Sequence, residues 1–97
     1  MNKIEISGII SNEPETFYSP SGLCIMNLKI VLDKQANKEN QIPVVAHGKI
    51  AEMNRGILKK ETKIAVHGEL QSRNYTTIDG ENKTVIEVIA KEIEIIK

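Results

Sequence analysis

Apolar and polar residues alternate along much of this chain, and a period of two is typical of strands with one buried face. Such alternation covers residues 3–10 and residues 23–33, and a short β-branched run covers residues 42–47. The first half of the chain therefore predicts three strands.

Two polar segments and one helix are predicted between the strands. Residues 11–22 hold two prolines and a glycine and predict a turn-rich loop, and residues 34–41 predict a second, polar loop. Residues 50–58 place apolar side chains near helical spacing, which predicts one short helix. Gly56 inside this helix costs roughly 1 kcal/mol relative to alanine, so we expect the helix to depend on packing.

A long hairpin is predicted in the second half of the chain. Residues 63–75 and 84–96 are strand-like, and Asp79-Gly80 between them is a strong turn signal. The alternation of the last run changes phase after Ala90. This odd spacing predicts a β-bulge near Lys91.

The predicted order is three strands, one helix and two strands, without repeats or a linker. Five strands with a short helix between the third and the fourth match an all-β, five-stranded Greek-key barrel, the OB-fold. Closing the barrel removes most exposed sheet edges, which a small domain otherwise has to protect. We therefore expect residues 1–97 to form a single OB-fold domain.

The charge of the chain is balanced overall and uneven along its length. The 97 residues include 13 basic and 13 acidic side chains, so the formal net charge is zero. Residues 34–63 carry seven basic and three acidic groups, for +4, whereas residues 1–33 and residues 64–97 each carry −2. This balance argues against a strongly basic nucleic-acid binder, and it leaves room for a moderate basic stripe in the middle third.

Membrane insertion and disulfide bonding are not expected. No apolar run approaches the ~20 residues of a membrane span, and the polar first residues do not resemble a signal peptide. The single cysteine, Cys24, excludes an internal disulfide and a cysteine-based zinc site. These features are typical of a cytoplasmic protein without a membrane partner.

The most suggestive candidate residues lie on the predicted hairpin. Arg73 and Tyr75 are two residues apart on one strand, so their side chains project from the same face. A cation beside an aromatic ring can hold a phosphate and stack a base, which binding to single-stranded nucleic acid requires. The alternative is a structural hairpin with an incidental tyrosine.

Further candidates for nucleic-acid contact are a histidine and several lysines. His47 is able to stack on a base or to carry a positive charge. The lysines that we expect to contact phosphates are Lys29, Lys49, Lys59, Lys60 and Lys63. No third ligand of suitable spacing accompanies His47 and His67, so we expect no metal site.

The sequence holds no recognisable catalytic constellation. Its serines have no histidine or aspartate partners by motif, and a glycine-rich phosphate loop is missing. We therefore expect a protein that is not an enzyme and that uses no cofactor and no small-molecule substrate.

Motifs along nearly the whole chain resemble the bacterial single-stranded DNA-binding protein family. They include Tyr18-Ser19-Pro20-Ser21-Gly22, Gly48-Lys49-Ile50-Ala51-Glu52, Gly68-Glu69-Leu70 with Ser72-Arg73, and Asp79-Gly80 with Glu87-Val88. The resemblance implies an OB-fold that binds single-stranded DNA in replication, recombination or repair, works at the nucleoid and forms a homodimer or homotetramer. The residues 23–32 or 42–46 are the apolar strands that we expect at such an interface.

The chain departs from the family pattern in its aromatic residues. The family stacks bases mainly on tryptophan and phenylalanine, and the corresponding positions fall here on Gln41, His47 and Tyr75. The chain has no tryptophan and three aromatic residues in all. Because each base–aromatic stack contributes ~1–3 kcal/mol, the resemblance predicts weaker stacking than is usual in the family, with Tyr75 as its principal ring.

Two alternatives remain open. The chain ends at Lys97 without the acidic-tipped tail of the family's replication hubs, and Ser19-Pro20-Ser21-Gly22 also resembles the short, tail-less PriB proteins. PriB-like proteins are dimers that couple single-stranded DNA to replication-restart proteins. The second alternative is an OB-fold protein-interaction module that does not bind DNA, which neutral charge and few aromatic residues favour.

Overall fold

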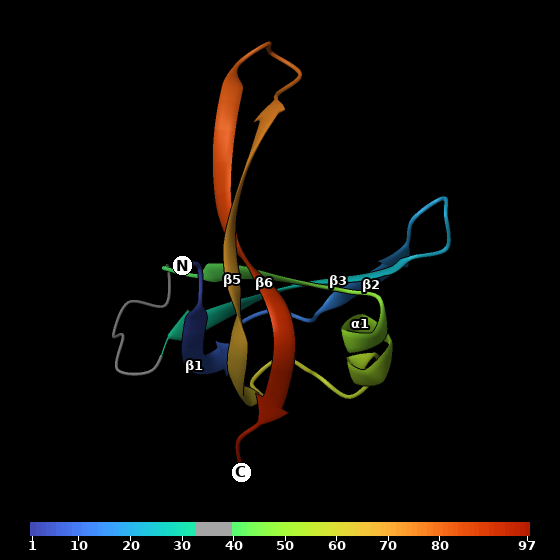
Figure 1. Cartoon of the computed structure of the whole chain (residues 1–97), viewed down its shortest axis with the longest axis vertical. Coiled ribbons are helices and arrows are strands. Elements are labelled where there is room, and N and C mark those ends of the chain that lie inside the picture. Colours follow the sequence, from blue (N-terminus) through green and yellow to red (C-terminus); the bar gives the residue numbers. More distant parts are fainter. Residues whose placement is uncertain (33–39) are drawn as a thin grey trace.

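The computed structural model describes residues 1–32 and 40–97. Within these residues, six strands and one helix follow one another (Figure 1). They are β1 (Ile4–Ile10), β2 (Glu15–Tyr18), β3 (Cys24–Leu32), β4 (Ile42–His47), α1 (Lys49–Asn54), β5 (Lys63–Thr76) and β6 (Asn82–Ile95).

The strands form a closed barrel. β1 pairs with β5, β5 with β6, β6 with β4 and β4 with β3, and β3 returns to pair with β1, so five strands close into a ring. The pairing of β4 with β6 is parallel, and the other pairings are antiparallel. The helix lies between β4 and β5, and the predicted OB-fold is confirmed.

Alternate residues of the strands fill the interior of the barrel. The fully buried side chains include those of Ile10, Met26, Leu28, Ile30, Val44, Ile64, Val66 and Val88. Ala51 of α1 and Leu58 after the helix complete this core, so α1 is held by packing, as the sequence predicts. The inward faces of β3 and β4 are part of the core, and the expectation that these strands supply an interface between copies of the chain stays a prediction.

The segment predicted as a single loop at residues 11–22 contains a strand. Its central residues pair with β3, from Glu15 opposite Asn27 to Tyr18 opposite Cys24. The prolines that suggested a loop, Pro14 and Pro20, lie just outside this four-residue strand. The prediction was wrong because pairing with the longer β3 stabilises a segment too short to show a pattern of its own.

The helix is shorter than predicted. It ends at Asn54 instead of residue 58, because Arg55 has an extended backbone and Gly56 has a φ of 78°. This left-handed conformation favours glycine, so Gly56 follows the helix and does not weaken its interior.

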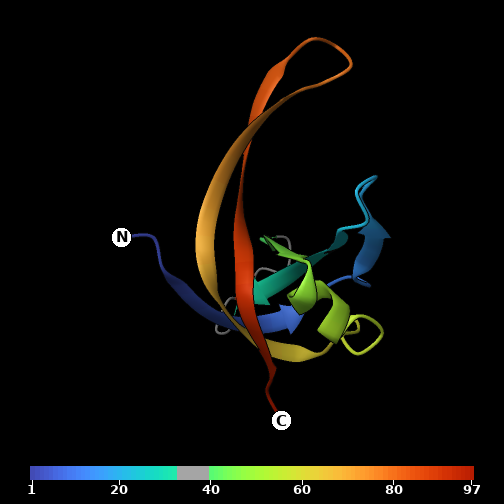
Figure 2. The same cartoon turned by 45° about the vertical axis from the view of Figure 1, so that its right-hand side comes forward.

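The hairpin of β5 and β6 reaches far beyond the barrel, and both views show it rising from the ring as an arm (Figures 1 and 2). Near its base, His67 pairs with Glu92 and Gly68 pairs with Ala90, so Lys91 is an extra residue on β6. The β-bulge predicted at Lys91 is confirmed. We call the part beyond the bulge, residues 70–88, the β5–β6 arm.

Two further expectations concern the loop after the second predicted strand and membrane insertion. The predicted end of the second strand at Asp33 and most of the predicted loop at 34–41 lie outside the described residues. Within residues 1–32 and 40–97, α1 is far too short to cross a membrane, and no longer apolar helix accompanies it.

Candidate nucleic-acid interface

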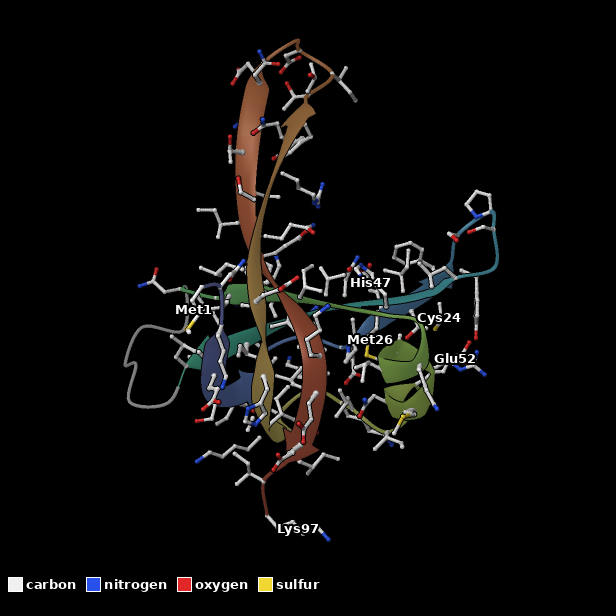
Figure 3. All side chains as sticks on the ribbon, in the orientation of Figure 1. Met1, Cys24, Met26, His47, Glu52 and Lys97 are labelled. Carbon is white, nitrogen blue, oxygen red and sulfur yellow. The ribbon has the colours of Figure 1, made fainter. Side chains whose placement is uncertain are left out.

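One outer face of the barrel carries polar and aromatic side chains from three adjacent strands. Val44 and Ala46 of β4 point into the core, so the alternating positions Pro43, Val45 and His47 point outward. Figure 3 shows His47 and the buried Met26 on opposite sides of the ribbons of β3 and β4.

A groove runs along this outer face to the base of the β5–β6 arm. Its volume is about 590 Å³, and it is partly open to solvent. It is lined by Asn12, Glu15, Asn27, Leu28, Lys29, Gln41, Pro43, Val44, Val45, Arg73, Val85 and Glu87. The groove therefore joins β2, β3 and β4 to the arm.

A row of three side chains borders the groove. Phe17 of β2 pairs with Ile25 of β3, and Ile25 pairs with His47 of β4, so the three lie in register on the face that also carries Val45. Phe17 is 46% exposed. We call these residues the Phe17–His47 row. The sequence did not single out Phe17 for base contact, because its segment was interpreted as a loop in which no side chain has a predictable direction.

Tyr75 and Arg73 lie on one face of the arm. Tyr75 pairs with Lys83, and Arg73 pairs with Val85 two residues along the same ladder. Because side chains alternate along a strand, Arg73 and Tyr75 project from the same face, as their spacing in the sequence predicts. The same face of the ladder carries Glu87, and the Tyr75 ring is 44% exposed. The arm therefore presents a ring and a guanidinium next to each other, with Arg73 nearer the barrel.

Arg73 is held by a buried carboxylate. Its Nε donates a hydrogen bond to Oε1 of Glu87 at 2.9 Å, and Nε2 of Gln71 donates a second bond to the same oxygen at 3.2 Å. The side chain of Glu87 is 6% exposed, whereas that of Arg73 is 56% exposed. The carboxylate is thus a fixed point inside the wall of the groove, and the guanidinium extends from it toward solvent.

The predicted lysines do not gather into one stripe. Lys29 lines the groove. Lys49 begins α1, Lys59 and Lys60 follow the helix, and Lys63 begins β5; these four are exposed and lie outside the lining of the groove. Among the described residues that line the groove, the cations of Lys29 and Arg73 are matched in number by the carboxylates of Glu15 and Glu87.

A separate cluster attaches β2 to the helix. Arg55 lies over the Tyr18 ring, 5.7 Å from its centre, and also donates a hydrogen bond to the Tyr18 hydroxyl. That hydroxyl donates to Glu52 of α1 at 3.3 Å. Desolvation, with a side-chain hydrogen bond to Cys24, raises the pKa of the Tyr18 phenol above its ordinary value. Tyr18 therefore has a structural role on the side of β2 that faces the helix, while Phe17 faces the groove.

Metal chemistry has no support at this site. Across residues 1–32 and 40–97, histidine, cysteine and carboxylate side chains form no cluster of three that is able to hold a metal ion.

Comparison with known proteins identifies the family. The model of the "Single-strand binding protein family" matches residues 1–96. The chain belongs to the single-strand binding protein family. Single-stranded DNA-binding protein 2 of Clostridium acetobutylicum is 33% identical over 103 residues, which cover all of this chain and 77% of that protein.

Other members of the family show a similar likeness. Single-stranded DNA-binding protein 3 of Clostridium acetobutylicum is 30% identical, over all of this chain and 72% of its own length. Single-stranded DNA-binding protein 2 of Chlorobaculum tepidum is 31% identical, over 97% of this chain and 70% of its own length. The family predicted from the sequence motifs is thus confirmed over nearly the whole chain.

Proposed function

We propose that this protein binds single-stranded DNA and acts in replication, recombination or repair. The observation that carries the proposal is the groove on the outer face of the barrel, which lies between the Phe17–His47 row and the arm that bears Tyr75. A groove that tracks the nucleic-acid backbone, with rings on which bases stack, is the arrangement that proteins use to bind single-stranded DNA or RNA. Membership of the family and the names of the relatives support the same ligand.

Binding combines electrostatic contacts to the DNA backbone with limited stacking. Lys29 contacts phosphate in the groove, and the exposed Lys49, Lys59, Lys60 and Lys63 contribute to a weaker, more diffuse positive potential. Tyr75, Phe17 and His47 stack on bases, which does not depend strongly on sequence because every base has a π-face. This mode involves binding only, so the protein is not an enzyme and needs no cofactor.

The proposal is tested by fluorescence anisotropy with a labelled oligo-dT strand of roughly 35 nucleotides, a length that spans several OB-fold sites. We expect binding at low salt that weakens steeply as salt is raised, because counterions are released from the phosphates. Absence of binding at low salt would contradict the proposal. A double-stranded competitor of the same length is expected to displace the strand poorly.

The protein is expected to form a homodimer or homotetramer and to work with replication or restart proteins at the nucleoid. Light scattering of the purified chain separates the two assemblies. A dimer favours the PriB-like alternative, whereas a tetramer favours the single-stranded DNA-binding proteins.

A protein-interaction module is the second candidate. The even balance of charge in the groove, with Glu15 and Glu87 against Lys29 and Arg73, favours it because carboxylates repel phosphate. In that case neither single-stranded DNA nor RNA binds at low salt, in the anisotropy experiment described above.

A further inference from the structure

The Arg73–Glu87 pair forms the wall of the groove at the base of the arm. Both residues line the groove, and Val85, the cross-strand neighbour of Arg73, lies beside them. In a chain with three aromatic residues, any other planar group on this face is a candidate surface for a base. The guanidinium of arginine is such a group, since it is planar and stacks on base rings.

The guanidinium is held in place before any ligand arrives. Its Nε–H is bonded to a carboxylate that is itself 6% exposed and receives a second bond from Gln71. A free arginine side chain loses much rotamer entropy when it binds, and a prior bond to a fixed acceptor reduces that loss. The remaining N–H groups have no hydrogen-bond partner among the described residues, and more than half of the side chain is exposed.

The same carboxylate makes Arg73 a poor phosphate contact. The negative charge of Glu87 lies 2.9 Å from Nε, so the pair as a whole carries no net charge. A phosphate that approaches the guanidinium also approaches the carboxylate, which repels it. A neutral base face is not repelled in this way.

We propose that Arg73, fixed by Glu87 and Gln71, is a stacking platform for one nucleobase and does not act as a phosphate contact. This inference rests on the proposed function, since it assigns one base of the bound strand to the face of the Arg73 guanidinium in the groove, beside Val85. Glu87 is then a positioning residue that acts through Arg73.

The test separates contacts to bases from contacts to the backbone. Binding is measured for labelled oligo-dT and for a strand of equal length made of abasic nucleotides. The dissociation constant of the abasic strand divided by that of oligo-dT reports the contribution of the bases, and we call it the ratio. Arg73→Lys keeps the charge and removes the plane. We expect it to weaken binding to oligo-dT about tenfold, to leave binding to the abasic strand unchanged and to leave the salt dependence unchanged.

A second variant tests the role of the carboxylate. Glu87→Gln keeps the size of the side chain and removes the charge that fixes Arg73. We expect the ratio to fall as in Arg73→Lys, while binding to the abasic strand becomes tighter because the groove gains one positive charge. The matched control is Arg55→Lys, the other arginine of the chain, which lies over Tyr18 outside the groove and is expected to leave the ratio unchanged.

The outcomes distinguish this inference from the proposed function. If the wild-type protein binds neither strand, the proposed function fails. If it binds oligo-dT and Arg73→Lys leaves the ratio unchanged, the platform is overturned. If circular dichroism shows that an Arg73 variant is unfolded, Glu87→Gln decides, and an unchanged ratio in that variant overturns the inference.

Discussion

Gly68 lies directly against the backbone of Ile89, so close that a Cβ atom added to it would stand 2.0 Å from the carbonyl oxygen of Ile89. This contact lies at the base of the arm, beside the step where the backbone of Lys91 has no opposite residue on β5. A bulge increases the local twist and bends the strand that contains it. The close approach and the bulge together set the direction in which the β5–β6 arm leaves the barrel.

Gly68→Ala is expected to destabilise the fold by about 1–3 kcal/mol, because backbone must move to make room for the methyl group. Urea unfolding followed by circular dichroism measures this loss as a lower midpoint. Ser72→Ala is the matched control, since Ser72 is an exposed residue of the same strand and its truncation is expected to stay within about 0.5 kcal/mol. Equal midpoints for both variants would show that the barrel adapts to a side chain at Gly68.

The arrangement of the barrel was largely predictable from the sequence. The alternation in β1, β3 and the first half of β5 marks their buried faces, and the change of phase after Ala90 located the bulge correctly at Lys91. What the sequence did not predict depends on pairing between distant segments. β2 exists because β3 is long enough to hold it, and the helix ends where Gly56 adopts a left-handed conformation.

The site was less predictable than the fold, because a groove depends on which strands become neighbours. Spacing alone placed Arg73 and Tyr75 on one face. Spacing does not indicate that Glu87, fourteen residues further along the chain, is buried against Arg73. It also does not bring Phe17 into register with His47, since β3 stands between them. A weak signal existed in the Thr16-Phe17-Tyr18 run, whose residue types favour strands.

Tyr75→Ala is expected to weaken binding to oligo-dT roughly tenfold, because a base stack on an aromatic ring contributes about 1–3 kcal/mol. The fold should be unaffected, since the ring is exposed on the arm. Tyr75→Phe keeps the ring and is expected to bind as the wild type does. Anisotropy titrations of the three proteins provide the comparison, and an unchanged affinity in Tyr75→Ala would mean that the arm is a structural hairpin only.

Phe17→Ala tests whether the Phe17–His47 row is part of the interface. The row borders the groove at the end far from the arm, so loss of the ring should weaken binding to a long strand about tenfold and affect a very short strand less. Ile57→Ala is the control, because Ile57 is also an exposed apolar side chain and lies after the helix, outside the groove. If both variants bind long strands equally well, the DNA does not reach β2.

Lys29→Met tests the electrostatic part of the interface. Lys29 lines the groove on β3, and each phosphate neutralised by a cation contributes about 0.7 to the slope of log K against log salt for single strands. The variant should therefore bind more weakly at low salt and show a slope that is shallower by about that amount. Lys91→Met is the matched control, because Lys91 lies on the bulge, paired with Glu69 at 3.9 Å and away from the groove, and its slope should equal that of the wild type. A wild-type slope in Lys29→Met would place the phosphates elsewhere, with Lys49, Lys59, Lys60 and Lys63 as the remaining predicted contacts.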